Sequence, residues 1–350
     1  MMNLLEINNL TVCFYKDFIF LKAVDNVSFS IAKGEIHALI GESGSGKTIT
    51  ALSILGLIDS PPGIVGGHIH FDGSDILRGL DTNCKVTEDK GTIVSVEHSH
   101  KWHQAHQERL KKIRGNRIAM IFQEPLSSLD PFYTVGEQLS EVLLHWNLCS
   151  SQTEARELGI EWLRKVAIKY PDRIFDYYPY QLSGGMSQRV MIAIALCSKP
   201  DLLIADEPTT ALDVTIQQEI VFLIKELRET LNLTILFITH DMTLVKSIAD
   251  NVTVLYKGRV LEKGTMGELV KKSNGFIHPF TECLLQPVTR WREWQGEALI
   301  ATKSPLTPEG CVYFQGCSKR LAKCERQSPP ASNLSITHQT YCWLCEASSK

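Results

Sequence analysis

Gly41-Glu42-Ser43-Gly44-Ser45-Gly46-Lys47-Thr48 follows the apolar run of residues 36–40 and leads into the helix-compatible segment TITALSILGLI. The stretch has the form G-x-x-x-x-G-K-T, whose glycines let successive backbone N–H groups turn toward one point at a helix N-terminus. We expect Lys47 to reach the β- and γ-phosphates of a nucleotide and Thr48 to reach its Mg²⁺. The sequence therefore predicts a strand, a phosphate loop and a helix that together bind a nucleotide.

The composition is that of an ordinary soluble globular protein, with 350 residues, of which 44% are hydrophobic and 21% charged. A formal net charge of −3 argues against a large nucleic-acid footprint, so we expect no nucleic-acid partner. The N-terminal segment MMNLLEINNLTVCF does not resemble an export signal, and no apolar run is long enough to span a bilayer. We expect the protein to stay in the cytosol, and to be held at a membrane only by other subunits.

The order of apolar segments predicts an α/β fold. Residues 4–40 alternate apolar and polar positions and are expected to form short strands. The runs 117–122, 201–206, 233–239 and 251–256 are apolar throughout, which is typical of a parallel sheet buried on both faces. The segment 215–231 between two of them has helical periodicity.

Two regions depart from this alternation. Residues 136–199 form a mostly helical block, in which Ser151 and Glu154 have capping-box spacing. From about Ser273 the pattern is broken by prolines, which predicts a separate C-terminal extension. We therefore expect a nucleotide-binding domain over residues 1–272 and an extension over residues 273–350.

Four further positions fit the chemistry of a nucleotide hydrolase. The apolar strand 202–206 ends in Asp206 and Glu207, which we expect to hold Mg²⁺ and to polarise the attacking water, respectively. Gln123 ends the strand of residues 117–122, where its amide oxygen could join the metal shell. His240 ends the strand of residues 233–239 and is the candidate for contacting the γ-phosphate.

The segment Leu182-Ser183-Gly184-Gly185-Met186-Ser187-Gln188 precedes the amphipathic helix RVMIAIAL. A serine and two glycines at a helix N-terminus form a second anion site. One small core rarely needs two such sites for one nucleotide. The pattern therefore indicates that this second site serves a nucleotide bound to another subunit.

These motifs, in this order and spacing, resemble the ATPase of an ATP-binding cassette (ABC) transporter over residues 4 to about 270. The resemblance implies a P-loop NTPase (RecA-like) core with an antiparallel β subdomain, a helical ABC subdomain and a C-terminal extension. It implies that Ser183, Gly184 and Gly185 act in trans on a partner's nucleotide, and that Asp213 communicates between the two sites. Met186 stands where the family more often has a polar residue. Phe14, or alternatively Tyr15, would stack on adenine.

The implied ligands are ATP and Mg²⁺. The implied catalytic residues are Glu207 and His240, and the Mg²⁺ shell would use Thr48, Gln123 and Asp206. The implied nucleotide-contacting residues are Phe14, Gly41, Glu42, Ser43, Gly44, Ser45, Gly46, Lys47, Thr48, Gln123, Ser183, Gly184, Gly185, Asp206 and Asp213.

The finer resemblance is to ATPase subunits of dipeptide and oligopeptide importers, and it is carried by the segments 122–138, 182–196, 204–217 and 278–285. Nickel-importing relatives share much of the sequence of these segments. The resemblance implies a peripheral subunit on the cytoplasmic face of the inner membrane. Its implied partners are a sister ATPase, as a heterodimer or homodimer, two transmembrane permeases and an extracytoplasmic peptide-binding protein. The alternatives are a nickel or other metal-ion importer, and a soluble ABC ATPase that acts on ribosomes or DNA. A pure metal-binding or redox module is disfavoured by the intact Lys47, Asp206 and Glu207.

Residues 82 to about 106 are an insertion relative to that subfamily. They carry four histidines, which are the residues His98, His100, His103 and His106. Imidazoles at such density could bind Zn²⁺ or Ni²⁺. No cysteine or carboxylate pattern completes a site, so we interpret the segment as a solvated surface loop and assign it no metal role.

Five of the ten cysteines crowd the C-terminal part of the chain. The spacing Cys311-x5-Cys317-x6-Cys324-x17-Cys342 resembles the cysteine motif at the C-terminus of peptide-importer ATPases. Four thiolates suit Zn²⁺ and a [4Fe–4S] cluster equally. The surroundings of Cys317 differ from the family pattern and Cys345 is additional, so free thiols in a docking extension are the alternative.

Overall fold

The structure is a computed structural model and describes residues 2–16, 19–58, 62–89, 92–210, 212–271, 275–286 and 310–345. The chain divides into two compact units. The first is built from Ala32–Ile36 and Gln107–Thr239, and the second from Asn3–Ile31, His37–His106 and the described residues from His240 onward. Candidate site residues occur in both units.

Parallel strands form the centre of the first unit. They are β8 (Ile118–Ile121), β9 (Leu202–Asp206) and β10 (Thr234–Thr239), with β9 paired to both of the others. Every residue of β9 and β10 is buried, which confirms the interpretation of these apolar runs as two-sided core strands. Helix α9 (Val214–Leu231) lies between them in the chain, and its C-cap Asn232 adopts a left-handed conformation with φ 52°.

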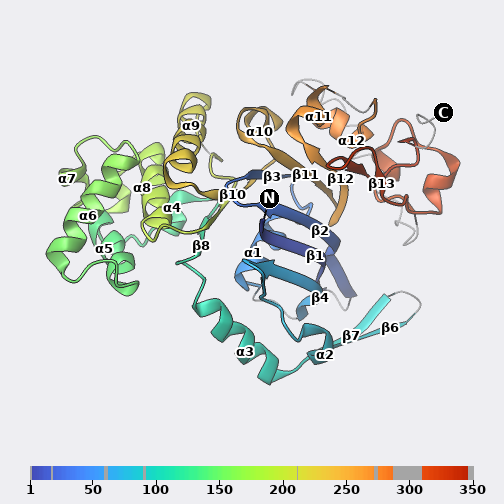
Figure 1. Ribbon diagram of the computed structural model, residues 1–350, viewed down its shortest axis with the longest axis horizontal. Helices are drawn as coiled ribbons and strands as arrows, with labels where there is room; N and C mark the ends of the chain where they lie inside the picture. The colour runs from blue at the N-terminus through green and yellow to red at the C-terminus, as the bar shows by residue number, and fades with distance from the viewer. Residues whose placement is uncertain are drawn as a thin grey trace. The chain divides into compact units, whose positions relative to one another are not determined.

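The helical block of the first unit is confirmed and gathers in one region of Figure 1. Its elements are α4 (Pro125–Ser128), α5 (Val135–His145), α6 (Gln152–Lys165), α7 (Pro171–Ile174), the 3₁₀ helix η1 (Pro179–Gln181) and α8 (Gly184–Leu196). The full capping box is at α5, between Thr134 and Glu137. At α6 the box is half formed, because Ser151 accepts from the Glu154 N–H while the Glu154 carboxylate accepts from Ser150.

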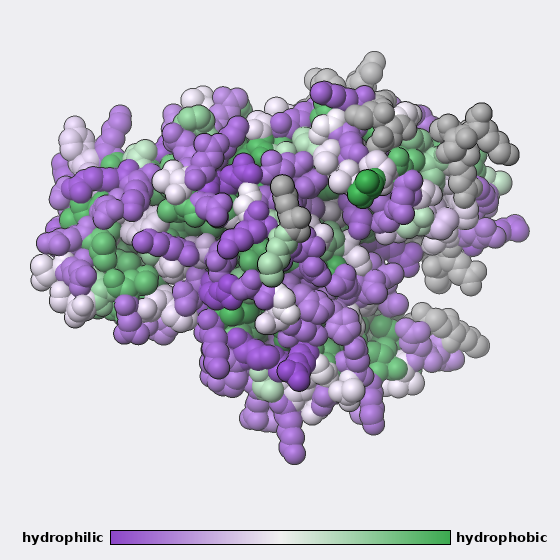
Figure 2. Space-filling model, viewed as in Figure 1, coloured by the Kyte–Doolittle hydropathy of each residue, from purple (hydrophilic) through white to green (hydrophobic). Residues whose placement is uncertain are grey.

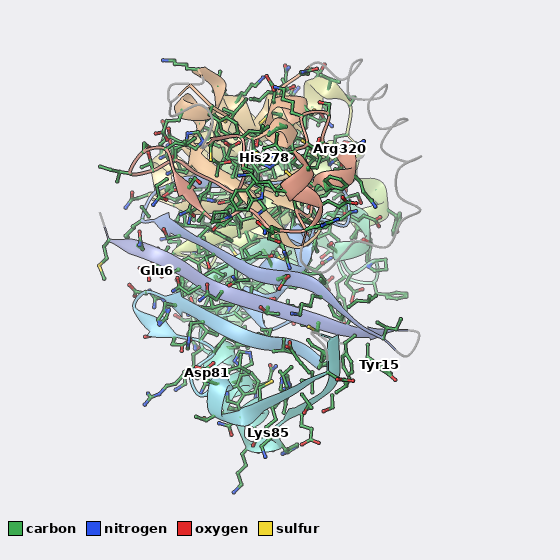
Figure 3. The ribbon with its side chains drawn as sticks, turned by 90° about the vertical axis from the view of Figure 1, so that its right-hand side faces the viewer. Glu6, Tyr15, Asp81, Lys85, His278 and Arg320 are labelled. Atoms are coloured by element: carbon green, nitrogen blue, oxygen red, sulfur yellow. The ribbon has the colours of Figure 1, made fainter. Side chains whose placement is uncertain are left out.

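The second unit contains an antiparallel sheet in the order β2-β1-β4-β5, where β4 pairs antiparallel with both β1 and β5. Its strands are β1 (Asn3–Lys16), β2 (Ile19–Ala32), β4 (Pro62–Phe71) and β5 (Ser74–Asp75). The first two are 14 residues long, so the expectation of short strands was wrong for this segment. Figure 3 shows Glu6 and Tyr15 toward opposite ends of β1.

A second set of strands in this unit carries the phosphate loop. Strand β3 (Ile36–Ile40) pairs in parallel with β11 (Asn251–Tyr256), and antiparallel pairing continues from β11 to β12 (Arg259–Thr265), β14 (Gln339–Thr340) and β13 (Ser332–Asn333). The helices are α1 (Lys47–Leu55), α10 (Met242–Ile248), α11 (Met266–Lys271) and α12 (Pro279–Leu284), with 3₁₀ helices η2 (Phe314–Gly316) and η3 (Ala322–Glu325).

The C-terminal extension shares one apolar core with these strands. Tyr313 is 1% exposed and its ring lies 5.2 Å from that of Tyr256 at the end of β11 and 5.2 Å from that of Phe280 in α12. A second buried contact joins His338 to Glu262 of β12, with a separation of 3.0 Å between Nε2 and Oε1. The extension is therefore tied to β11 and β12 by both apolar packing and a buried polar pair.

The insertion is folded, which corrects its interpretation as a solvated loop. It forms α2 (Leu80–Asn83), a hairpin of β6 (Cys84–Asp89) and β7 (Thr92–His98), and α3 (His100–Lys111). Trp102 and His106 are 7% and 3% exposed, and their rings stack at 4.9 Å. The physical reason is that the Trp102 and His106 rings, four residues apart on α3, stack on each other. The Trp102 indole N–H also donates to the carbonyl of Arg78, just before the insertion.

Among the described residues, the structure contains no helix that combines the length and the apolar character of a membrane span. On the face seen in Figure 2, hydrophilic residues predominate and hydrophobic ones form small separate groups.

Candidate functional site

The phosphate loop joins β3 to α1 in the second unit. Gly46 is the N-cap of α1 and has a φ of 98°, a conformation that favours glycine. Lys47 is 5% exposed, and its Nζ donates to the carbonyl oxygens of Gly41 (2.9 Å) and Glu42 (2.8 Å). Thr48 is exposed at the first turn of the helix. The loop thus presents a helix N-terminus, a lysine folded across it and an accessible hydroxyl.

The turn between β11 and β12 supports this loop from the same unit. The Gly258 N–H donates to the Ser45 carbonyl at 3.0 Å. A Cβ on Gly41 would lie 2.2 Å from the Leu255 carbonyl oxygen, and one on Gly46 would lie 2.6 Å from that of Ala23. Both glycines are therefore required by close backbone approach, and the loop is held by its surroundings before a ligand arrives.

Two side chains of the loop bear on its ligand. The Ser45 hydroxyl is buried and has no hydrogen-bond partner among the residues that the structure describes, which is costly unless a ligand or water satisfies it. Burial raises the pKa of the Glu42 carboxyl, while Lys257 and Lys47 oppose that rise. The Ser45 hydroxyl, buried within the glycine-rich loop, can donate a hydrogen bond to a bound phosphate oxygen. The exposed Thr48 hydroxyl can serve as a ligand of Mg²⁺.

The second unit also carries the adenine candidates and His240. Phe14 is half-buried on β1, whereas Tyr15 is 54% exposed and packs against Phe20 with ring centres 4.9 Å apart. His240 is exposed immediately before α10, whose N-cap Asp241 accepts from the Thr243 N–H at 2.7 Å. These positions leave the side chains of both His240 and Tyr15 accessible.

The carboxylates predicted to act in hydrolysis lie at the end of β9 in the first unit. Asp206 is 2% exposed, and the next residue, Glu207, has a φ of 45°, which is unusual for a non-glycine residue and typical of functional positions. The Glu207 Oε2 accepts from Gln123 Nε2 at 3.2 Å and from Thr210 Oγ1 at 2.9 Å. The structure thus brings Gln123 and Glu207 together, and it adds Thr210, which sequence reasoning missed.

The signature segment begins α8 on the surface of the first unit. Ser183 is the N-cap, and its hydroxyl accepts from the Met186 N–H at 3.4 Å. Ser183 and Gly184 are exposed, and a Cβ on Gly185 would lie 3.0 Å from a methyl carbon of Ile216 in α9. The glycines therefore permit close packing of α8 on α9, while the helix N-terminus stays open to an incoming anion.

Asp213 caps a helix, a role that was not predicted from the sequence. It is the N-cap of α9, and its carboxylate accepts from the Ile216 N–H at 3.0 Å. Capping of this kind stabilises a helix by about 1 kcal/mol. The side chain is nevertheless exposed, so capping and contact with another molecule are compatible.

The cysteines of the extension lie near one another but do not form a metal site. Burial raises the pKa of the Cys311 thiol to about 11 and that of Cys342 to about 12, and neighbouring thiols, Cys317 among them, add to both rises. Within the part of the chain that the structure describes, no three His, Cys, Asp or Glu side chains are arranged to hold a metal ion. As placed in the described residues, these thiols do not offer Zn²⁺ or an iron–sulfur cluster a set of ligands.

These elements define a phosphate-loop ATPase of the α/β class, and comparison with known proteins agrees. The family model described as ABC transporter matches residues 24–210. The chain belongs to the ABC transporter family, as an ATP-hydrolysing cassette whose ligands are ATP and Mg²⁺. This confirms the resemblance read from the motifs.

Among curated proteins, the chain is 42% identical to the oligopeptide transport ATP-binding protein AppD of Bacillus subtilis (strain 168), over 99% of this chain and 98% of AppD. It is 36% identical to the dipeptide transport ATP-binding protein DppD of Escherichia coli (strain K12), over 97% and 96% of the two chains. Among solved structures, the ATP-binding cassette MJ0796, a dimer bound to ADP and Pi, is 28% identical with a TM-score of 0.59, and the match covers 75% of this chain and 98% of that one.

Proposed function

We propose that this protein is the ATPase subunit of a peptide importer, and that it hydrolyses ATP to drive uptake of dipeptides or oligopeptides across the cytoplasmic membrane. The observation that carries the proposal is the extent of the likeness to the two peptide-transport proteins. Both matches run through the C-terminal extension, whereas the match to the cassette MJ0796 covers 75% of the chain. A generic cassette accounts for ATP hydrolysis, and the extension is what the peptide-transport relatives add.

Each candidate residue receives a role in this proposal. The phosphate loop and Lys47 bind the β- and γ-phosphates, and Phe14 stacks on adenine. Thr48, Gln123 and Asp206 hold Mg²⁺, which neutralises charge on the phosphates. Glu207 accepts a proton from the attacking water, and its hydrogen bonds from Gln123 and Thr210 orient it for that step.

The same proposal assigns a partner ATPase. The exposed N-terminus of α8 offers Ser183 and Gly184 to an anion that this chain's own loop does not need. We propose that it contacts the γ-phosphate held by a sister subunit, with Asp213 communicating between the two sites. The dimeric state of MJ0796 supports this arrangement by analogy. We further propose that domain boundaries fall near residue 272, with the extension beyond it.

Two permeases and an extracytoplasmic peptide-binding protein would complete the transporter, and this subunit would lie on the cytoplasmic face of the membrane. The segment after Gln123 is the proposed contact with the permeases. Phe132 and Tyr133 on that segment are 84% and 55% exposed, and large aromatic side chains are unusual on a free surface but common as interface anchors.

The test is transport by the reconstituted complex of this subunit, its sister ATPase, the permeases and the binding protein. Labelled dipeptides and oligopeptides and labelled Ni²⁺ are supplied separately outside proteoliposomes that contain ATP. ATP-dependent peptide uptake is the expected result. Uptake of Ni²⁺ without peptide uptake would establish the metal-importing alternative, and hydrolysis without transport of either would point to the soluble class.

A further inference from the structure

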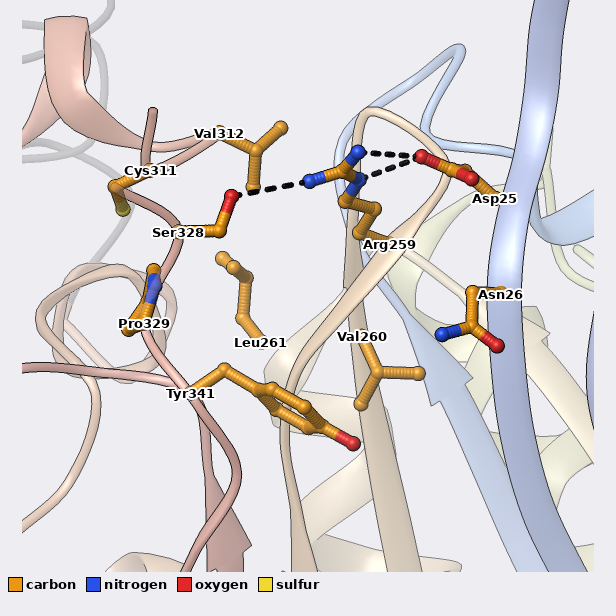
Figure 4. Close-up of a pocket in the computed structure, with 10 residues that line it drawn as sticks. All are labelled: Asp25, Asn26, Arg259, Val260, Leu261, Cys311, Val312, Ser328, Pro329 and Tyr341. Atoms are coloured by element: carbon orange, nitrogen blue, oxygen red, sulfur yellow. Dashed lines mark hydrogen bonds and ion pairs between the residues drawn. The ribbon is translucent and has the colours of Figure 1, made fainter. Parts of the chain in front are cut away.

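A pocket in the second unit has no part in the proposed function. It has a volume of about 280 Å³ and is formed by β2, β12 and the C-terminal extension. Figure 4 shows Asp25 and Asn26 on one side, Ser328 and Pro329 on the other, and Arg259 between them. The pocket thus combines residues that are far apart in the sequence, and it depends on the extension for one of its walls.

The polar side of the pocket carries one charge of each sign. Arg259 donates through Nε and Nη2 to Asp25 Oδ2, at 2.7 and 2.6 Å, and through Nη1 to the Ser328 hydroxyl at 3.4 Å. The Arg259 and Asp25 side chains are 38% and 17% exposed, so water reaches the guanidinium more than the carboxylate and screens this pair in part. Asp25 Oδ1 also lies 3.9 Å from Lys22 Nζ, which is not part of the lining and lies 3.9 Å from Glu88 Oε1 as well. The lining itself thus has one charge of each sign, and a molecule that carries both charges can contact both Arg259 and Asp25.

Much of the remaining lining is apolar. Val260 and Leu261 of β12 are 7% and 1% exposed, and Val312 and Pro329 continue this surface from the extension. The volume of about 280 Å³ corresponds to roughly nine waters at ~30 Å³ each, close to the number of heavy atoms in an amino acid or dipeptide. Tyr341 also lines the pocket, and its hydroxyl donates to Gln339 Oε1 at 3.2 Å.

We propose that this pocket binds a small zwitterion, a free amino acid or a dipeptide, with its carboxylate on Arg259, its ammonium on Asp25 and its side chain on Val260 and Leu261. Opposite charges, an apolar wall and a volume of this size are the features that such a ligand requires.

The pocket is connected to the phosphate loop by a single turn. Gly258, which directly precedes Arg259, donates its N–H to the Ser45 carbonyl at 3.0 Å and accepts from the Asp25 N–H at 2.8 Å. Both charged residues of the pocket therefore adjoin the contact that supports the loop. A ligand that shifts the Arg259–Asp25 pair changes ATP affinity, and by linkage ATP changes ligand affinity by the same factor. Binding of a cytoplasmic amino acid or peptide in the pocket would thus change the affinity of the phosphate loop for ATP. Only this last step rests on the proposed peptide function.

The test is calorimetric titration of the full-length protein with L-leucine and with L-alanyl-L-alanine, which separate the amino acid from the dipeptide. N-acetyl-L-leucine lacks the ammonium and L-leucine amide lacks the carboxylate. Saturable binding of at least one zwitterion, with a tenfold or greater loss for both blocked compounds, is the expected result. Failure of both zwitterions to bind, or equal binding of the blocked compounds, would overturn the proposal.

Variants localise the binding. In Asp25→Asn the advantage of leucine over N-acetyl-leucine should disappear. Asn26→Gly removes the polar amide that lines the pocket beside Asp25, at a native φ of 59° that suits glycine, so leucine affinity should fall several-fold with the ion pair intact. Asp176→Asn is the matched control, because Asp176 forms an equivalent pair with Arg156 at 2.7 Å in the other unit. An unchanged leucine affinity in Asn26→Gly, or a loss in Asp176→Asn, would contradict the assignment.

Coupling is measured with a fluorescent ATP analogue. Saturating zwitterion should change its affinity at least fivefold, a typical size for linked sites. No change would refute the link to the phosphate loop. Ligand binding without peptide uptake by the reconstituted complex would refute the proposed transport function and leave the proposed ligand site standing. Peptide uptake without ligand binding would refute the ligand site and leave the transport function standing.

Discussion

Replacing Gly46 by alanine should separate backbone strain from steric contact in the phosphate loop, because Gly44 offers a matched control. Both glycines have positive φ, 98° at Gly46 and 77° at Gly44, so alanine at either costs about 1–2 kcal/mol of strain. A Cβ at position 46 would also lie 2.6 Å from the Ala23 carbonyl oxygen, whereas a Cβ at position 44 would have no atom within 4 Å among the described residues beyond its own chain neighbours. Because that oxygen belongs to the backbone of β2 and cannot rotate away, overpacking adds about 1–3 kcal/mol.

The loop can relieve this contact only by moving its N–H groups away from the phosphates. The extra ~1–3 kcal/mol therefore predicts that Gly46→Ala binds nucleotide roughly 5- to 150-fold more weakly than Gly44→Ala. Titration of both purified full-length variants with a fluorescent ATP analogue measures this ratio, and circular dichroism checks that both are folded. Equal affinities in two folded proteins would refute the account of how the neighbouring backbone shapes the loop.

Three further outcomes are expected. Ser183→Arg should leave ATP binding by this chain intact but reduce hydrolysis at the sister subunit's loop; loss of ATP binding by the folded, isolated variant would contradict a role in trans. Because burial raises the pKa of Cys311 from 9.0 to about 11, its thiolate population at pH 7.5 should be about 100-fold below that of an unfolded thiol, and alkylation followed by mass spectrometry should show correspondingly slow labelling. Burial acts to raise the pKa of Glu268, but hydrogen bonds from Ser335, Thr265 and Thr337 outweigh it and lower the pKa from 4.5 to about 2. The stabilisation is therefore present above pH 4.5 and lost as the pH falls toward 2, so the protection factors of amides in β13 and β14, which are exchange rates corrected for the intrinsic rate at each pH, should fall over that range, less steeply in Glu268→Gln; equal profiles would contradict this.

The sequence predicted those features whose signal is local. The run ending in Asp206 is apolar at every position and became β9, and the loop at Gly41 to Thr48 was recognisable because its glycines and lysine have fixed spacing. Ser183 likewise precedes an uninterrupted helix, α8. In each case a short segment contains the whole pattern, so no knowledge of distant residues was needed.

What the sequence did not predict depends on distant residues. Trp102 and His106 are buried against distant residues and contact the carbonyl groups of Arg78 and Ile76. The insertion that contains them is polar, so its sequence did not predict that these two side chains are buried. The pair of Asp25 and Arg259 joins residues 234 positions apart. Such contacts follow from the tertiary fold, which a local pattern does not encode.

The cysteines illustrate the limit of a motif. Spacing suggested a common ligand set, and the structure does place their thiols near one another. Ligand geometry depends on where each sulfur points, and the described residues do not provide it. Proximity was thus implied by the pattern, while coordination was not.

Glu207 is proposed to promote hydrolysis of ATP held by this chain's own phosphate loop. This role is tested most directly in the reconstituted complex, with the sister ATPase disabled by replacement of its phosphate-loop lysine, so that this loop alone can turn over. Glu207→Gln keeps the size of the side chain and its φ of 45° but removes the base. ATP binding should stay within about twofold, and phosphate release should fall by about 10²–10⁴-fold. Undiminished phosphate release by the folded variant complex would contradict the account.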